Sequence, residues 1–144
     1  MKLAADLEEF LERYHRSLEA FIKGNPSPQE RIWSRRDDVT LANPLGPPAR
    51  GWAEVSEALG RAVSQLSDGE VIAVDRISGY ASGDLAYIVE IERDRVRLGR
   101  ARERVSMALR VTTIFRREDD GWKVLHRHAD PITTPRPVES MVQE

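Results

Sequence analysis

Two hydrophobic periods divide the chain. Between residues 3 and 22, apolar side chains recur every three or four positions with charged residues between them, which is typical of an amphipathic helix. Gly24-Asn25-Pro26 ends this helix, and Ser27-Pro28 can open a second, short one. The helical spacing returns over residues 52–66, after a proline-rich loop at residues 44–48.

From residue 70 onward the period changes to two. Residues 71–80, 85–93, 105–116 and 122–130 are predicted to be strands, joined by segments rich in Gly, Asp and Arg, and residues 39–43 form a short strand before the proline loop. Helices followed by sequential strands at hairpin spacing indicate an α+β fold with an antiparallel sheet. We expect a single domain over residues 1–132 and a flexible tail over residues 133–144.

Strand alternation selects the face that each strand turns to the helices. In residues 85–93 the more apolar set is Leu85, Tyr87, Val89 and Ile91, which is therefore expected to face inward. The opposite face of the sheet mixes apolar and charged side chains, a pattern that favours pairing with a second subunit. A homodimer is predicted through the outward residues of the last two strands: Arg110, Thr112, Ile114, Val124, His126 and His128.

Composition narrows the function classes. The chain has 144 residues, enough for one domain, and its net charge of −2 gives no basis for electrostatic binding to nucleic acid. It contains no cysteine, which removes thiolate chemistry and suits a reducing compartment. Neither a bilayer-spanning apolar run nor a signal-peptide core is evident, so a cytoplasmic protein without membrane partners is expected. No cofactor is predicted.

Three stretches of sequence resemble a known superfamily. Residues 37–51 look like the strand–loop–helix segment of ketosteroid isomerases and other SnoaL-like proteins, and Gly83-Asp84-Leu85-Ala86-Tyr87 looks like that superfamily's hairpin. Residues 110–117, followed by residues 121–128, are similar to its last two strands and to the end of the calmodulin-dependent kinase association domain. The resemblance to this SnoaL-like, nuclear transport factor 2-like superfamily implies a cone-shaped, cystatin-like roll. Three N-terminal helices would pack in the concave face of a curved, mainly antiparallel sheet around a pocket.

The resemblance also offers a test of chemistry. A ketosteroid isomerase needs a tyrosine, a carboxylate base and a protonated second acid. Their counterparts in this chain are Tyr14, Asn43 and Thr113. An amide does not take up a proton at neutral pH, so steroid isomerase chemistry is not expected. The resemblance points Arg127 into the pocket and His126 and His128 away from it.

Most candidate residues have two interpretations. Tyr14 either donates a hydrogen bond to a ligand or is a core tyrosine bonded to backbone. Asn43 either holds a ligand or water, or satisfies its own loop. Arg127, if inward, either favours an anionic ligand such as a carboxylate or pairs with Glu90, Asp130 or a helix acid. Asp130 is a candidate base or the cap of a turn before Pro131.

The two histidines of His126-Arg127-His128 lie on one face of a strand. Zinc requires a third ligand, and no matching acid or histidine is recognisable in the sequence, because His15 belongs to the first helix. No metal site is therefore predicted.

The leading hypothesis is a domain that binds a small, largely apolar molecule, with which a carboxylate or carbonyl group is compatible. One alternative is an isomerase, cyclase or hydrolase that uses Tyr14, Arg127 or Asp130 in catalysis. Another is an assembly module with a vestigial pocket. The residues expected to line the pocket are Tyr14, Leu18, Trp33, Asn43, Trp52, Leu59, Tyr87, Val89, Thr113, Phe115 and Arg127.

Overall fold

The computed structural model describes residues 3–143, which form three α-helices, one short 3₁₀ helix and one sheet. The helices are α1 (Ala5–Ile22), α2 (Ser27–Ile32) and α3 (Trp52–Val63). The strands are β1 (Thr40–Ala42), β2 (Ala49–Arg50), β3 (Leu66–Ser82), β4 (Leu85–Leu98), β5 (Val105–Glu118) and β6 (Gly121–Asp130).

The helix α1 follows directly from its sequence pattern. Leu7, Leu11 and Tyr14 lie on one stripe and are almost completely buried, while the positions between them carry charge. The helix ends because Gly24 adopts a φ of 95°. The amide of Asn25 then donates to the carbonyl of Ala20 at 2.9 Å, which closes the last turn.

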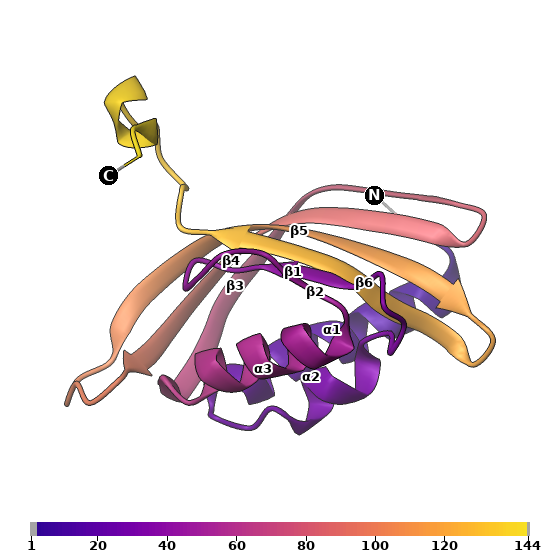
Figure 1. Ribbon diagram of the computed structural model, residues 1–144, viewed down its shortest axis with the longest axis horizontal. Helices are drawn as coiled ribbons and strands as arrows, with labels where there is room; N and C mark the ends of the chain where they lie inside the picture. Colours follow the sequence, from indigo (N-terminus) through magenta and orange to yellow (C-terminus); the bar gives the residue numbers. More distant parts are fainter. Residues whose placement is uncertain (1–2, 144) are drawn as a thin grey trace.

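The sheet has six strands in the order β2-β1-β6-β5-β4-β3. All neighbours are antiparallel except β1 and β6, which run parallel. Register shifts along β3, between Ser67 and Glu70, Val71 and Ala73, and Arg76 and Ser78, bend that strand strongly. Figure 1 shows the sheet arching over the three helices, which lie on its concave side. The predicted α+β roll is confirmed.

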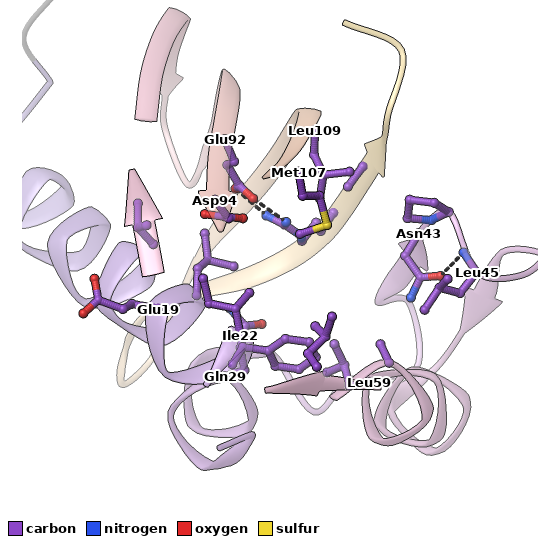
Figure 2. A pocket seen from close by; sticks show the side chains of 18 of the residues that line it. Glu19, Ile22, Gln29, Asn43, Leu45, Leu59, Glu92, Asp94, Met107 and Leu109 are labelled. Atoms are coloured by element: carbon purple, nitrogen blue, oxygen red, sulfur yellow. Dashed lines mark hydrogen bonds and ion pairs between the residues drawn. The ribbon is translucent and has the colours of Figure 1, made fainter. Parts of the chain in front are cut away.

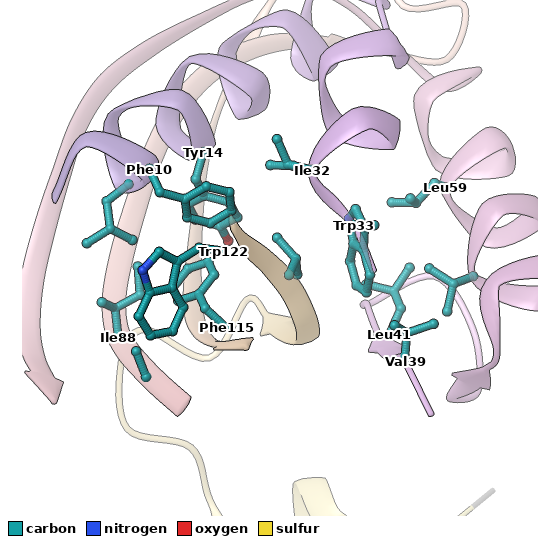
Figure 3. Close-up of a cluster of buried hydrophobic side chains, with 14 of the residues drawn as sticks. Phe10, Tyr14, Ile32, Trp33, Val39, Leu41, Leu59, Ile88, Phe115 and Trp122 are labelled. Atoms are coloured by element: carbon teal, nitrogen blue, oxygen red, sulfur yellow. The ribbon is translucent and has the colours of Figure 1, made fainter. Parts of the chain in front are cut away.

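The core lies between the helices and the concave face of the sheet. Figure 3 shows Phe10 and Tyr14 of α1 against Phe115 of β5, and both rings meet the Phe115 ring edge-on at centroid distances of 5.5 and 5.2 Å. Trp33 and Val39 fill the space toward α3. Trp33, Phe115 and Tyr14 are at most 1% exposed, so the centre of this half of the roll is filled by aromatic rings.

Two predictions about β4 are wrong. The strand extends to Leu98 instead of ending at Arg93, and its inward side is the set Ala86, Ile88, Glu90, Glu92, Asp94 and Val96. Tyr87 and Val89 therefore belong to the outer face, and the Tyr87 side chain is 37% exposed. The expectation that the more apolar side faces inward fails here, because two of the inward carboxylates have partners on other elements. Glu90 contacts His15 and Arg76, and Glu92 pairs with Arg127.

Smaller differences concern the ends of elements. α3 ends at Val63, and Leu66, predicted as its last turn, begins β3. β1 is shorter than predicted, and the two-residue strand β2 beside it was not predicted.

The chain leaves the sheet after Asp130. Residues 131–137 carry no regular structure, and a short 3₁₀ helix follows at Val138–Met141, away from the sheet in Figure 1. The flexibility expected of residues 133–144 stays a prediction, and residue 144 lies outside the described residues. Within residues 3–143, no helix combines the length and the apolar composition needed to span a membrane.

Candidate functional site: a cavity beside a buried ion pair

A cavity of about 580 Å³ occupies the end of the roll away from the aromatic core. Its floor is the second half of α1 together with α3, and its walls are strands β3 to β6 and the loop that follows β1. Figure 2 shows Ile22, Gln29 and Leu59 on the helix side, with Met107 and Leu109 of β5 across from them. The aliphatic part of the lining comprises Leu18, Ile22, Leu41, Leu45, Leu59, Ala62, Leu66, Val71, Val74, Leu98, Met107, Leu109 and Ala129.

The polar wall of the cavity is built on a buried ion pair. Nη1 and Nη2 of Arg127 donate to the two carboxylate oxygens of Glu92, each at 2.9 Å, so the pair is bidentate. Arg127 Nη1 also donates to the Tyr14 hydroxyl at 2.6 Å, and that hydroxyl lies 2.7 Å from Thr113 Oγ1. The network joins β4, β5, β6 and α1 at the boundary between the packed core and the cavity.

The buried network perturbs the pKa of its members. Burial, assisted by the charge of Glu92, raises the pKa of Tyr14 to about 12, so the phenol stays protonated. Burial alone would lower the pKa of Arg127, but Glu92 and Tyr14 beside it raise it above its ordinary value. Arg127 therefore keeps its charge, and Glu92 compensates it.

Asp94 lies on the same wall but outside this network. It is two residues beyond Glu92 on the inward side of β4, and Figure 2 shows the two carboxylates next to each other. Its side chain is 6% exposed and lines the cavity. Burial and then the charge of Glu92 raise the pKa of Asp94 to about 6, although Arg127 opposes the shift. A carboxyl group of this kind changes protonation state near neutral pH.

A second carboxylate network lies beside α1. Glu90 is 2% exposed, and its Oε1 is 2.8 Å from Nε2 of His15, a residue that lines the cavity. Arg76 Nε lies 3.5 Å from the other oxygen of Glu90, and Arg76 Nη1 donates to Glu8 at 3.2 Å. The inward acids Glu90 and Glu92 are thus both paired.

The structure brings only part of the predicted pocket together. Leu18, Asn43, Leu59 and Arg127 line the cavity. Asn43 also satisfies its own loop, since its Oδ1 accepts from the amide of Leu45 at 3.0 Å (Figure 2). The bond to its own loop is therefore observed, and a role of Asn43 in holding a ligand or water stays a prediction.

The remaining predicted lining residues lie elsewhere. Tyr14 and Thr113 are fully buried in the polar network behind the cavity wall. Trp33 and Phe115 are core residues, and Trp33 Nε1 donates to Gln29 at 3.0 Å. Trp52 packs under the guanidinium of Arg35, 3.9 Å from its ring centroid. Tyr87 and Val89 face outward, because β4 presents its other side to the helices.

Two expectations about charge need correction. Arg127 does point inward, but it is not a free cation, since both terminal nitrogens contact Glu92, a partner that the sequence interpretation did not consider. Asp130 does not line the cavity; it accepts from Arg110 at 2.8 Å and from the amide of Ile132 at 2.9 Å. Although burial alone would raise its pKa, these donors hold the pKa of Asp130 below its usual value.

The histidines of β6, a strand paired with β1 and β5, lie on the outer face of the sheet. His126 Nδ1 is 2.7 Å from Thr40 Oγ1, and His128 Nε2 is 3.5 Å from Asp130. Burial and the neighbouring His128 lower the pKa of His126. In the part of the chain that the structure describes, no three His, Asp or Glu side chains are grouped to hold a metal ion.

Sequence reasoning missed Glu92, Asp94 and His15. The available signal was the spacing of Glu90, Glu92 and Asp94, which places three carboxylates on one strand face. Because the alternate set is more apolar, this face was expected to point outward, toward a second subunit.

A curved sheet that encloses helices and a side cavity defines the class of α+β rolls with a cystatin-like fold. The sequence pattern of the SnoaL-like domain matches residues 8–133, and the chain belongs to this family. No functionally curated protein matches the chain.

Several solved structures share the fold. A nuclear transport factor 2-like superfamily protein from Salmonella enterica is 16% identical with a TM-score of 0.75, over 92% of this chain and 94% of the other. A ketosteroid isomerase-like protein from Erwinia carotovora atroseptica is 17% identical with a TM-score of 0.73, over 92% and 100%. A nuclear transport factor 2-like protein with a cystatin-like fold from Novosphingobium aromaticivorans is 17% identical with a TM-score of 0.66, over 96% and 90%. At these identities the comparison establishes the fold alone.

The ion pair gives a test of the network. We expect Arg127→Leu to lower the free energy of unfolding by about 3–4 kcal/mol, because it leaves Glu92 buried without its partner. The double variant Arg127→Leu/Glu92→Leu should return to within about 1 kcal/mol of the parent protein. Urea unfolding followed by tryptophan fluorescence measures both. Arg61→Leu, which removes an exposed pair with Glu57, is the control and should cost less than about 1 kcal/mol. Equal losses in the single and double variants would contradict this account.

Replacing Asp94 should have the opposite effect and raise the free energy of unfolding. Its folded pKa of about 6 exceeds the ordinary 3.8, so the unfolded chain releases the proton first as pH rises. The resulting stability penalty builds up between about pH 4 and pH 6, stays constant above, and is at most about 3 kcal/mol. We expect Asp94→Asn to stabilise the protein by about 1–2 kcal/mol at neutral pH and to have little effect below about pH 4. Denaturant unfolding across this range, with Asp119→Asn in the exposed β5–β6 turn as control, measures it. A gain that does not vary with pH would rule out titration of Asp94 as the cause.

Proposed function

We propose that the domain binds a small, largely apolar molecule in the cavity between α1, α3 and the concave face of the sheet. The observation that carries this proposal is a hollow of about 580 Å³ with a mainly aliphatic lining, next to a core that is otherwise packed with aromatic rings. Ligand pockets have volumes of roughly 300–1,000 Å³ and the same combination of apolar walls and few polar groups.

Protein interiors are close-packed, and unfilled apolar volume lowers stability. A vestigial pocket would be expected to be filled by large side chains such as those of Trp33, Trp52 and Phe115. None of these three lines the cavity. The open space therefore supports ligand binding over a purely structural role for this end of the roll.

The proposal is tested by filling the cavity. Adamantanol, an uncharged and compact apolar probe, should bind the parent protein, and Leu109→Trp should weaken binding at least about tenfold because the indole occupies the probe's volume. Leu85→Trp, on the exposed outer side of β4, is the matched control and should bind like the parent. Isothermal titration calorimetry gives the affinities, and native mass spectrometry of freshly purified protein reports any retained ligand. Absence of binding by a folded parent protein would refute the proposal.

We further propose that the outer face of the sheet forms a homodimer interface. Tyr80, Tyr87 and Ile114 stand side by side across β3, β4 and β5, and the two tyrosine rings are 6.4 Å apart. Tyr80 is 60% exposed and Leu85 is 51% exposed. Val124 was expected from the sequence to lie at this interface. It does not, because it is completely buried on the inner side of β6. Exposed apolar side chains in one contiguous area favour a partner surface.

Sedimentation equilibrium tests the dimer. The parent protein should have twice the monomer mass, and Tyr87→Glu should yield monomers because it places a charge in the middle of the apolar row. Met141→Glu, a similar change at an exposed apolar residue outside the sheet, should remain dimeric. A monomeric parent protein would refute the dimer, and it would leave the ligand proposal unaffected.

A further inference from the structure

Asp94 differs from the other ionisable side chains of the cavity. Each of the others has an oppositely charged or hydrogen-bonding partner within 4.0 Å: His15 with Glu90, Arg16 with Glu12, Glu19 with Lys23, and Glu92 with Arg127. Within residues 3–143, Asp94 makes neither a hydrogen bond nor an ion pair. More than nine-tenths of its surface is buried, and the rest faces the cavity. Its carboxylate oxygens are not fully enclosed by protein, so they are open to a hydrogen-bond donor in the cavity.

The neighbours of Asp94 leave its charge uncompensated. Its partner residues on the adjacent strands are Val71 of β3 and Met107 of β5, both apolar and both in the cavity wall. The nearby cation is Arg127, whose guanidinium is bonded to Glu92 and Tyr14. Two carboxylates therefore share one positive charge, and the wall has a net charge of −1 once Asp94 is ionised.

No cation on α1 corrects this imbalance. Arg16 is 70% exposed and lies near Glu12, and Glu19 adds a second acid at the cavity rim. The imidazole of His15 is held by the buried carboxylate of Glu90. Since charges interact strongly in a desolvated site, an anionic ligand is disfavoured beside Asp94 and a cationic one is favoured.

We propose that the ligand of this cavity is an apolar amine, whose ammonium group binds Asp94 while its hydrocarbon body packs against Leu18, Leu59 and Leu109. This inference rests on the proposed function, because it assigns a chemical class to the ligand of the same cavity. The sequence favoured a ligand with a carboxylate, on the assumption that Arg127 is unpaired, whereas the present inference is a cationic ligand. An ammonium group supplies the hydrogen-bond donors that Asp94 lacks.

Three probes with the same hydrocarbon cage separate the possibilities: adamantylamine, adamantanol and adamantane carboxylate. At about pH 7.5 we expect the amine to bind at least about tenfold more tightly than the alcohol, and the carboxylate to bind most weakly. Asp94→Asn should reduce the affinity for the amine to that for the alcohol and leave the alcohol unchanged. Asp119→Asn, an exposed aspartate outside the cavity, is the matched control and should preserve the preference for the amine.

The pH dependence gives a second, independent readout in the unmodified protein. The pKa of Asp94 is about 6, so lowering the pH from about 7.5 to about 5 should weaken binding of the amine about tenfold as the carboxylate is protonated. Binding of the alcohol should stay constant. His15→Gln should keep this pH dependence, which separates Asp94 from the imidazole at the cavity wall.

The outcomes are distinct. Equal affinities for amine and alcohol, or loss of the pH dependence in His15→Gln, would overturn the amine inference and leave the small-molecule proposal standing. If none of the three probes binds the folded protein, the proposed function fails as well. Should Asp94→Asn fold poorly, Asp94→Ser and the pH dependence of the parent protein decide the same question.

Discussion

The bidentate pair between Arg127 and Glu92 is the interaction on which the interior of the roll depends. Burying either charge alone costs several kcal/mol, so the two strands that carry them, β4 and β6, must keep their relative position across β5. The Tyr14 hydroxyl extends the pair to α1, and Thr113 takes the remaining hydrogen bond. The network thus sets the distance between helix and sheet, and it forms the boundary between a solid half and a hollow half.

The same pairing explains why β4 turns its polar side inward. Alternation alone makes a strand present its more apolar face to the core, but it does not count the partners that other elements bring. Glu90 and Glu92 are acceptable inside because His15, Arg76 and Arg127 meet them there. The apolar residues displaced to the outer face, Tyr87 among them, then create the exposed surface on the convex side.

Much of the fold could be predicted from the sequence. The period of 3.6 located α1 and α3, the Ser27-Pro28 start signal located α2, and the glycine and proline signals placed helix boundaries to within a few residues. The inward direction of Arg127 could be obtained only through the resemblance, because β6 contains a register shift opposite Ile114 and Phe115 that disturbs simple alternation. The face of β4 could not be predicted. The segment Gly99–Arg104 joins β4 to β5 without a turn type that defines the register, so nothing in the sequence links Glu92 to Arg127.

The site was harder to predict, because a cavity forms where the surrounding side chains leave space unfilled, and the sequence does not show where that happens. The cavity is not lined by the buried aromatic residues Phe10, Trp33, Phe115 and Trp122. Phe21 contributes an aromatic ring to a lining that otherwise consists mainly of aliphatic side chains. Sequence interpretation assigned several large rings to the pocket, but rings of that size close space when they are buried. Leucine, valine and methionine leave a gap when the opposing helix is held away, and the Tyr14–Arg127–Glu92 network holds it there. Asp94 then remains as the one inward acid of β4 without a partner among the described residues, at the place where the structure has left room for one.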